Sequence, residues 1–220
     1  AGPILGCDQH LPLGDLCRQL RPDAARCPAK VRPWLQVAPA RREALAAALP
    51  RRGAPRLGLA WHSEAAVLGP RKSMSLAELA AAVARPGLEL VCPQYGPVEA
   101  ELAALRQATG TEVRTLAGLD RRDDLEGMAA LIESCDLVIT ISSATAHLSG
   151  ALGRPTWLLQ HQVPYWPWQL EGERSLWYGS VRLFRQRHGG NWREPLAELS
   201  EALTAWLEEP ERHQAILGSR

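Results

Sequence analysis

The sequence predicts an α/β protein built on one Rossmann-like, doubly wound and mainly parallel sheet of six strands. From about residue 55 onward, short apolar runs alternate with helical patterns, as expected of parallel strands joined by helical crossovers. One of these runs, LVITI at residues 137–141, is short, β-branched and bounded by a charge. This pattern is typical of a strand that is buried on both faces of a parallel sheet.

Apolar runs, helical patterns and helix start and stop signals predict the positions of the strands and helices. We expect strands at residues 57–61, 88–92, 112–116, 137–141, 156–159 and 181–184. We expect helices at residues 75–84, 98–109 and 125–134, and a final amphipathic helix at residues 194–207. Ser75 and Glu78 form a Ser-x-x-Glu capping box at the start of the first helix, and Gly110 is a stop signal after the second.

The first 55 residues have a different character. They hold eight prolines and scattered arginines, with a single convincing helical pattern at about residues 42–49. They are too few for a separate α/β domain, so we expect them to wrap the domain or extend from it without a core of their own. The predicted organisation is an irregular segment at 1–55, a Rossmann-like domain at 56–208 and a tail at 209–220.

Composition excludes several classes of function. Of the 220 residues, 46% are hydrophobic and 22% charged, which is ordinary globular composition, and a net charge of +1 gives no case for nucleic acid or a membrane surface. No apolar run approaches the roughly 20 residues of a membrane span, and no charged-then-apolar leader resembles a signal peptide. We therefore expect a cytoplasmic protein. Because the first residue is Ala rather than Met, we expect a trimmed chain or a piece of a longer one.

The cysteines do not suggest a metal centre. There are five, an odd number, and Cys7, Cys17 and Cys27 are too widely spaced for a paired metal knuckle. Cys92 and Cys135 fall in apolar segments. We expect free thiols and no structural metal.

The segment that follows the 137–141 strand is the strongest candidate site. Ser142 and Ser143 are good helix N-caps, and a helix of small residues and leucines continues from Ala144 until Gly153 stops it. A helix N-terminus at the carboxyl edge of a parallel sheet favours phosphate, so Ser142, Ser143 and Ala144 are placed to hold a diphosphate. His147 lies four residues after Ser143, on the same helix face. The simpler alternative is that the serines only cap the helix and His147 packs under a loop.

Two other loops follow predicted strands. Arg71 and Lys72 lie in a mobile-looking loop at the start of a helix, and Lys72 is well placed for a phosphate, although a solvated basic pair is an equal alternative. Gln94, after the second strand, can donate and accept hydrogen bonds in a cleft or serve only as a turn residue. Trp61, His62 and Tyr95 in the same loops are further candidate cleft residues.

Common cofactor and catalytic motifs are missing from the sequence. It has no G-x-G-x-x-G after the first strand, no Walker lysine motif, no H-E-x-x-H and no G-x-S-x-G. A nicotinamide or flavin dinucleotide site is therefore unexpected. Aromatic residues concentrate late in the chain, and we expect most of them to pack within the domain: Trp157, Tyr165, Trp166, Trp168, Trp177 and Tyr178.

Several sequence blocks occur together in one known family. They are Gly58-Leu-Ala-Trp61, Arg71-Lys-Ser-Met-Ser-Leu76, Cys92-Pro-Gln-Tyr-Gly-Pro97, Cys135-Asp-Leu-Val-Ile139, Ala146-His-Leu-Ser-Gly-Ala-Leu-Gly-Arg-Pro155, Trp166-Pro-Trp168, Ser175-Leu-Trp-Tyr178, Leu183-Phe-Arg-Gln186 and Trp192. In order and spacing the chain resembles the C-terminal half of glycosyltransferases similar to bacterial ADP-heptose:lipopolysaccharide heptosyltransferases, especially those found behind tetratricopeptide repeats. The resemblance covers most of residues 56–206.

This resemblance implies a GT-B enzyme, in which two Rossmann-like domains face each other and the C-terminal one binds a nucleotide-sugar. The family segment Asp-Thr-x-x-x-His falls on Ser142, Ser143 and His147, which by analogy lie at the diphosphate. Lys72 falls where the family has a basic residue near the phosphates, and Gln94 keeps the family's glutamine. No metal and no cofactor are needed, because amides and cations can stabilise the leaving diphosphate.

The sequence also departs from the family pattern. Ser142 replaces an Asp that would contact the sugar, Tyr95 stands where Lys is common, Pro167 where Arg is frequent, and Gly127-Met128 where Asp-Thr is frequent. Each change removes a polar group. The resemblance implies that the acceptor domain, which carries the general base in such enzymes, is largely absent from these 220 residues, with residues 1–55 as its remnant or edge. The spacing of Asp8 and Asp15 marks neither as that base.

Two functions therefore stay open at this stage. The first is a metal-independent glycosyltransferase, or its donor-binding domain, that moves a sugar from a nucleotide-diphosphate sugar to a glycan, lipid-linked sugar or protein. An upstream tetratricopeptide-repeat or acceptor domain would be its partner. The second is a degenerate, noncatalytic module for weak nucleotide binding or protein interaction.

Overall fold

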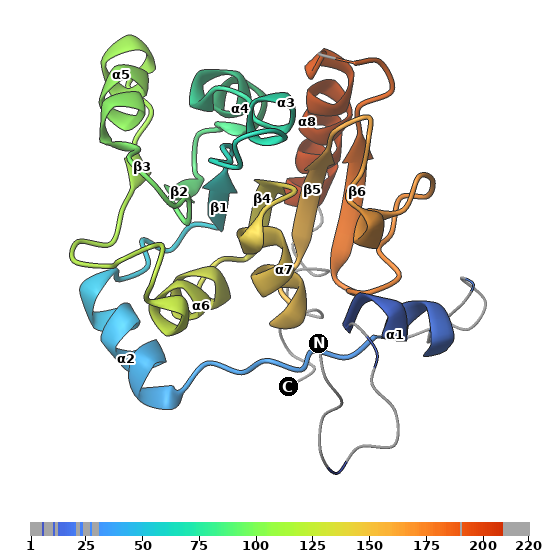
Figure 1. Cartoon of the computed structure of the whole chain (residues 1–220). Helices are drawn as coiled ribbons and strands as arrows, with labels where there is room; N and C mark the ends of the chain where they lie inside the picture. Colours follow the sequence, from blue (N-terminus) through green and yellow to red (C-terminus); the bar gives the residue numbers. More distant parts are fainter. Residues whose placement is uncertain are drawn as a thin grey trace.

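A computed structural model of the chain describes residues 31–189 and 191–208, together with residues 6, 11, 13–20, 23 and 27. It contains a six-stranded, fully parallel sheet in the order β3-β2-β1-β4-β5-β6 (Figure 1). The strands are β1 (Arg56–Ala60), β2 (Glu89–Val91), β3 (Val113–Arg114), β4 (Leu137–Ile141), β5 (Thr156–Gln160) and β6 (Val181–Arg185). The predicted Rossmann-like sheet is confirmed.

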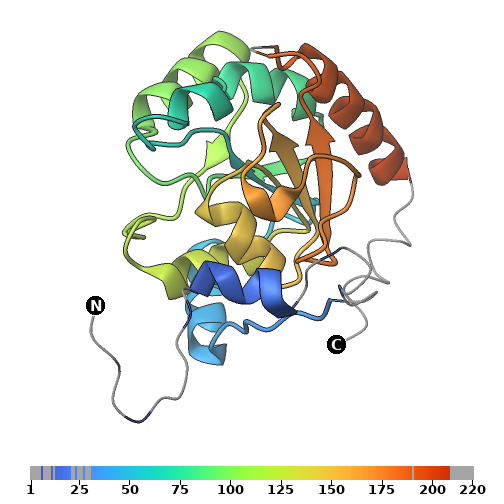
Figure 2. The same ribbon diagram turned by 45° about the vertical axis from the view of Figure 1, so that its right-hand side comes forward.

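Helices cover both faces of the sheet. They are α1 (Leu13–Leu20), α2 (Pro39–Ala48), α3 (Gly69–Lys72), α4 (Leu76–Val83), α5 (Glu99–Thr109), α6 (Leu125–Glu133), α7 (Ala144–Ala151) and α8 (Arg193–Glu208), with a 3₁₀ turn η2 (Trp166–Trp168). Figures 1 and 2 show α4, α5 and α8 on one side of the sheet, and α2, α6 and α7 on the other.

Strand β4 shows why the sheet needs two helical layers. Successive side chains of a strand point to opposite faces. Leu137, Ile139 and Ile141 pack in the cluster that includes α4 and α8, whereas Val138 packs in the cluster that includes α6. All five residues of β4 are buried, which agrees with the continuous apolar run in the sequence.

The element boundaries mostly follow the sequence signals. Ser75 and Glu78 form the expected capping box at α4, and Gly110 ends α5 with a left-handed φ of 74°. The segment expected to be a mobile-looking loop around Arg71 is instead the short helix α3, which places Lys72 on a defined turn. Helix α1 was not predicted, because its eight residues carry no clear start or stop signal.

The N-terminal segment packs on the sheet domain. Val37, Leu45 and Leu49 join α6 in one apolar cluster. The amide N–H groups of Trp34 and Leu35 both donate to the carbonyl of Ala151, at 3.0 and 3.2 Å. Residues 31–49 therefore contribute to the packing of the α6–α7 face. The predicted tail at residues 209–220 lies outside the described part of the chain.

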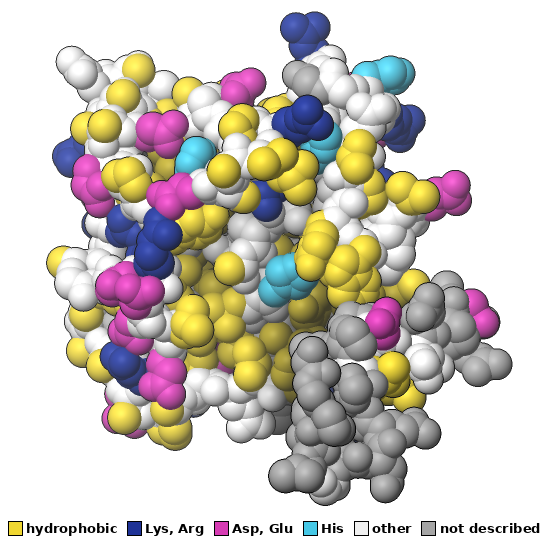
Figure 3. Space-filling model, in the orientation of Figure 1, with side chains coloured by type: hydrophobic (Ala, Val, Ile, Leu, Met, Phe, Trp, Pro, Cys, Tyr) yellow, Lys and Arg dark blue, Asp and Glu magenta, His cyan; other side chains and the backbone are white. Residues whose placement is uncertain are grey.

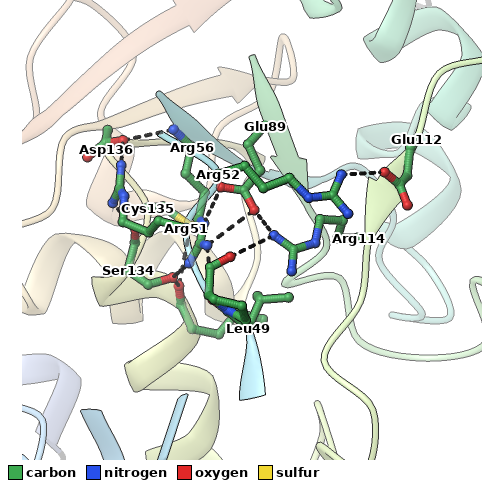
Figure 4. Close-up of polar contacts among 12 residues, drawn as sticks. Leu49, Arg51, Arg52, Arg56, Glu89, Glu112, Arg114, Ser134, Cys135 and Asp136 are labelled. Carbon is green, nitrogen blue, oxygen red and sulfur yellow. Dashed lines mark hydrogen bonds and ion pairs between the residues drawn. The ribbon is translucent and has the colours of Figure 1, made fainter. Parts of the chain in front are cut away.

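Below the amino ends of the strands, a charged network joins the same segment to the sheet (Figure 4). Arg56 donates to both carboxylate oxygens of Glu89, at 3.0 and 3.2 Å, and Arg114 contacts the same carboxylate. The side chains of Arg56 and Glu89 are 1% and 2% exposed. Arg56 also donates to the carbonyl of Leu49, and Arg114 donates to that of Pro50. A buried ion triad thus fixes where the N-terminal segment enters β1.

Two properties expected from composition can be examined in the structure. The described cysteines Cys27, Cys92 and Cys135 are free thiols, and burial raises the pKa of Cys92 to about 11. Across the described residues, no helix combines the length and the apolar character that a membrane crossing requires.

Candidate functional site

A cavity of about 470 Å³ opens at the carboxyl ends of β4 and β5. Strands β2 and β3 are added on one side of β1, and β4 to β6 are added on its other side. In folds of this type ligands bind at this switch point, outside the carboxyl ends of the strands. Figure 3 shows hydrophobic and His side chains gathered over this part of the face. The lining residues are Ala65, Val67, Leu68, Arg71, Lys72, Ser142, Ser143, Ala144, His147, Gln160, His161, Val163 and Tyr165.

One wall of the cavity is the N-terminus of α7. Ser143 occupies the N-cap position in extended backbone conformation, but its hydroxyl makes no cap hydrogen bond. The hydroxyl lies instead 3.3 Å from Oγ1 of Thr140. The amide N–H groups in the first turn of a helix have no intrahelical acceptor. The amide of Ala146 donates to the carbonyl of Ser143 at 3.1 Å. Since the Ser143 side chain caps none of the others, the amides at the very start of α7 are available to an anion in the cavity.

Lys72 supplies a positive charge beside these amides. Its Nζ donates to the carbonyl of Ser142 at 2.7 Å, so the ammonium lies at the turn between β4 and α7. Burial lowers the pKa of Lys72 from its ordinary value. Arg71 lines the same cavity, and none of the described lining residues is Asp or Glu. The cavity therefore favours an anionic ligand.

Ser142 is largely buried at the cavity wall, and its hydroxyl is bound by an aromatic residue. Its Oγ accepts a hydrogen bond from the indole Nε1 of Trp168 at 2.9 Å, and Ser142 is 6% exposed. The indole of Trp168 is fully buried and stacks on the ring of His147, with centroids 4.7 Å apart. Trp168 thus lies directly behind the cavity wall.

His147 lines the cavity one turn into α7, on the same wall as Ser143. Its Nδ1 lies 2.9 Å from the hydroxyl of Tyr178. Burial and the charge of Lys72 lower the pKa of His147, so the imidazole is neutral at neutral pH. A neutral imidazole can donate a hydrogen bond through only one of its two nitrogens.

Gln94 lies apart from this cavity. It is fully buried, and its Oε1 accepts from the backbone amides of Trp61 and His62, both at 2.8 Å. Its Nε2 donates to the carbonyls of His62 and Tyr95. The amide group therefore joins the loops that follow β1 and β2, which makes Gln94 a positioning residue for these loops in this conformation.

The remaining candidates also lie outside the cavity lining. The indole of Trp61 is buried in the core and donates to Glu101 at 2.5 Å. His62 is exposed, and the Tyr95 hydroxyl contacts Ser63. Asp15 lies in α1, and Asp8 falls outside the described residues.

The structure adds lining residues that sequence reasoning missed. Gln160, His161, Val163 and Tyr165 come from the end of β5 and its loop. The available signal was the position of the fifth strand, whose carboxyl end lies beside that of β4 in a doubly wound sheet. In the described part of the chain, no group of three or more His, Cys, Asp or Glu residues could hold a metal ion.

The comparison with protein families identifies the family to which this chain belongs. The model of glycosyltransferase family 9 (heptosyltransferase) matches residues 44–159, more than half of the chain and including the turn at Ser142 and Ser143. The chain belongs to glycosyltransferase family 9. The matched residues contain α7 and most of the cavity lining.

Several relatives of this family 9 chain are longer than the chain itself. It is 35% identical over 198 residues to protein FlbA of Caulobacter vibrioides, which covers 89% of this chain and 33% of FlbA. The structure of E. coli ADP-heptose lps heptosyltransferase II is similar with a TM-score of 0.60 at 22% identity, over 87% of this chain and 59% of that one. A family 9 glycosyl transferase from Veillonella parvula has a TM-score of 0.52 at 17% identity, over 84% and 54%. The chain thus spans about a third of FlbA and just over half of the two solved structures.

Proposed function

We propose that this chain is the donor-binding part of a glycosyltransferase and binds a nucleotide-diphosphate sugar in the cavity at α7. The observation that carries the proposal is that the Lys72 ammonium lies beside the N-terminus of α7, where the first amides of the helix have no side-chain cap. This arrangement offers hydrogen-bond donors and positive charge to the same anion. Membership of family 9 supports the transfer of a sugar.

The same groups would serve the chemical step. In glycosyl transfer the diphosphate is the leaving group, and negative charge grows on it as the bond to the sugar breaks. Preorganised amides and a cation stabilise such charge without reorganisation. In the proposed enzyme Ser143, Ala144 and Lys72 take this role, and no metal ion is required. The acceptor would be a glycan, a lipid-linked sugar or a protein. The group that deprotonates it would lie outside the described lining of this cavity, which contains no Asp or Glu.

Titration calorimetry with a panel of nucleoside diphosphates (ADP, UDP, GDP, CDP and dTDP) tests the proposal. We expect at least one of them to bind, with the same affinity in excess EDTA as in Mg²⁺. Failure of the whole panel to bind would contradict the donor site, and binding only with Mg²⁺ would contradict metal independence.

A second function is favoured by one specific observation. Ser142 stands where the resembled family has an Asp for the sugar, and its hydroxyl is already engaged by Trp168. Such a chain could bind nucleotide weakly, or mediate an interaction, without transferring sugar. The isolated chain is therefore expected to bind nucleoside diphosphate about as well as the matching nucleotide-sugar, with no detectable donor hydrolysis or transfer. Sugar transfer by the unmodified chain would exclude this degenerate function.

The variant Ser142→Asp separates sugar recognition from diphosphate binding. A carboxylate has a longer reach than a hydroxyl and accepts hydrogen bonds from sugar hydroxyls. It also adds a negative charge near the phosphates. We expect unchanged or lower affinity for the nucleoside diphosphate and a higher preference for the sugar-bearing donor, measured by calorimetry with both ligands. Ser142→Asn is the uncharged control, and an unchanged preference in Ser142→Asp would remove this position from the sugar site.

A further inference from the structure

Tyr178 lies behind the cavity and contacts His147 from a different part of the chain. It is in the segment between η2 and β6, 31 residues after His147. Its hydroxyl lies 2.9 Å from Nδ1 of His147, and the two rings meet edge to face with centroids 5.7 Å apart. Among the described residues, Nδ1 is the only hydrogen-bond partner of this hydroxyl.

The surroundings of Tyr178 hold its ring in place. Gly150 of α7 lies against it, and a Cβ atom on that glycine would be 2.5 Å from Cγ of Tyr178. On another side, the indole of Trp34 stacks on the ring with centroids 5.3 Å apart. The Trp168 ring lies 5.7 Å away, centroid to centroid. A glycine and two indoles therefore pack around the Tyr178 ring and restrict its position.

The direction of the hydrogen bond follows from the donors and acceptors present. Burial raises the pKa of Tyr178, so its hydroxyl keeps its proton. If Nδ1 of His147 carried the imidazole proton, the phenol proton would have no acceptor among the described residues. If the phenol donates to Nδ1, both groups are satisfied, since neutral imidazole accepts through its unprotonated nitrogen. The first arrangement leaves the phenol of Tyr178 as the unpaired donor, and Tyr178 is not among the residues that line the cavity. The second leaves Nε2–H of His147, which does line the cavity, so solvent or a ligand can accept its proton. The second arrangement is therefore favoured.

We propose that Tyr178 is a positioning residue that donates to Nδ1 of His147 and thereby fixes the imidazole tautomer with its proton on Nε2. Nε2 has no hydrogen-bond partner among the described residues, and His147 lines the cavity beside Lys72 and Ser143. The fixed tautomer presents an N–H donor, rather than a lone pair, to the diphosphate. A lone pair at this place would repel the phosphate oxygens. The inference rests on the proposed function for the ligand, whereas the tautomer is a property of the ligand-free protein.

The direct test is the ¹⁵N spectrum of the histidine rings in the ligand-free chain at a pH where His147 is neutral. We expect Nε2 of His147 to be protonated and Nδ1 unprotonated, as one dominant tautomer. In Tyr178→Phe, which keeps the ring but removes the donor, we expect a mixture of tautomers. The affinity for the nucleoside diphosphate that binds the wild type should fall by roughly 2- to 10-fold, the scale of one hydrogen bond.

Two further variants control the experiment. Gly150→Ala should displace the Tyr178 ring and produce the same spectral change, and alanine is a better helix former than glycine, so α7 is not weakened by its backbone. Tyr165→Phe removes a phenol hydroxyl from the cavity lining without touching Nδ1, and should leave the His147 tautomer unchanged.

The outcomes separate this inference from the proposed function. A protonated Nδ1 in the wild type, or the same tautomer and affinity in Tyr178→Phe as in the wild type, would overturn the role of Tyr178. A single Nε2–H tautomer that is lost in Tyr178→Phe, in a protein that binds no nucleoside diphosphate, would support the tautomer assignment and contradict the donor site.

Discussion

Replacing Glu89 by Ala is expected to lower the free energy of unfolding by about 3–5 kcal/mol, because it leaves buried cations without their counter-charge. Arg56 and Arg114 share this carboxylate, and Arg56 is as deeply buried as Glu89 itself. The loss should be visible in urea denaturation as a lower midpoint with a similar slope.

The matched control for this variant is Glu112→Ala. Glu112 pairs with Arg52 at 2.7 Å in the same region, but both side chains are about half exposed. An exposed pair of this kind contributes about 0–1 kcal/mol. If Glu89→Ala were no more destabilising than Glu112→Ala, the triad would not hold the N-terminal segment to the sheet.

The pH dependence of stability gives an independent check on Glu89. Burial acts to raise the pKa of its carboxyl, but the hydrogen bonds and charges of Arg56 and Arg114 outweigh burial and lower it. A carboxyl whose pKa is lower in the folded state stabilises the protein above its unfolded pKa, about 4.3 for Glu. Its contribution should be fully present above that pH and be lost as the pH falls further. In Glu89→Gln this part of the acid dependence should disappear.

Replacing Lys72 by Ala is expected to weaken nucleoside diphosphate binding by about 1–3 kcal/mol, or roughly 5- to 150-fold. The Lys72 ammonium lies at the turn that carries the α7 amides, within the region where the proposed function puts the phosphates. Titration calorimetry with the best ligand of the panel measures the change. Lys72→Met, which keeps most of the apolar stem, should lose as much affinity if the charge is what matters.

An exposed cation that does not line the cavity controls for the general loss of charge. Arg187→Ala removes a positive charge that is paired with Glu198 on the surface and is not part of the cavity lining. It should bind the nucleoside diphosphate like the wild type. Wild-type affinity in Lys72→Ala would show that the Lys72 ammonium bonds only to the turn at Ser142 and does not contribute to ligand binding.

The sheet was predictable because its signals are local. The run at residues 137–141, the capping box at Ser75 and the stop at Gly110 each depend on residues within a few positions of one another. Alternation of strands and helices then favours one parallel, right-handed arrangement. Residues whose structure depends on packing were less predictable. The segment at α3 was expected to be a loop but is helical. The sequence of α1 has no signal that distinguishes it from the irregular segment around it.

Part of the candidate site was also predictable from local sequence. Ser143 and His147 share a helix face because they are four residues apart, and Ala144 begins the helix, so their proximity follows from the sequence by itself. The sequence likewise placed Lys72 after the first strand and Ser142 after the fourth, whose carboxyl ends a parallel sheet brings together.

Only the tertiary structure decided what these side chains contact. Gln94 follows a strand at the edge where a cleft is expected, yet its side-chain amide is fully hydrogen-bonded to the backbone of two loops. Ser142 is held by Trp168, and His147 is held by Tyr178, which in turn lies between Gly150 and Trp34. These partners are separated by tens of residues along the chain. A hydrogen bond requires a particular distance and direction in space. For residues so far apart in the sequence, both depend on how the elements pack and not on local sequence spacing.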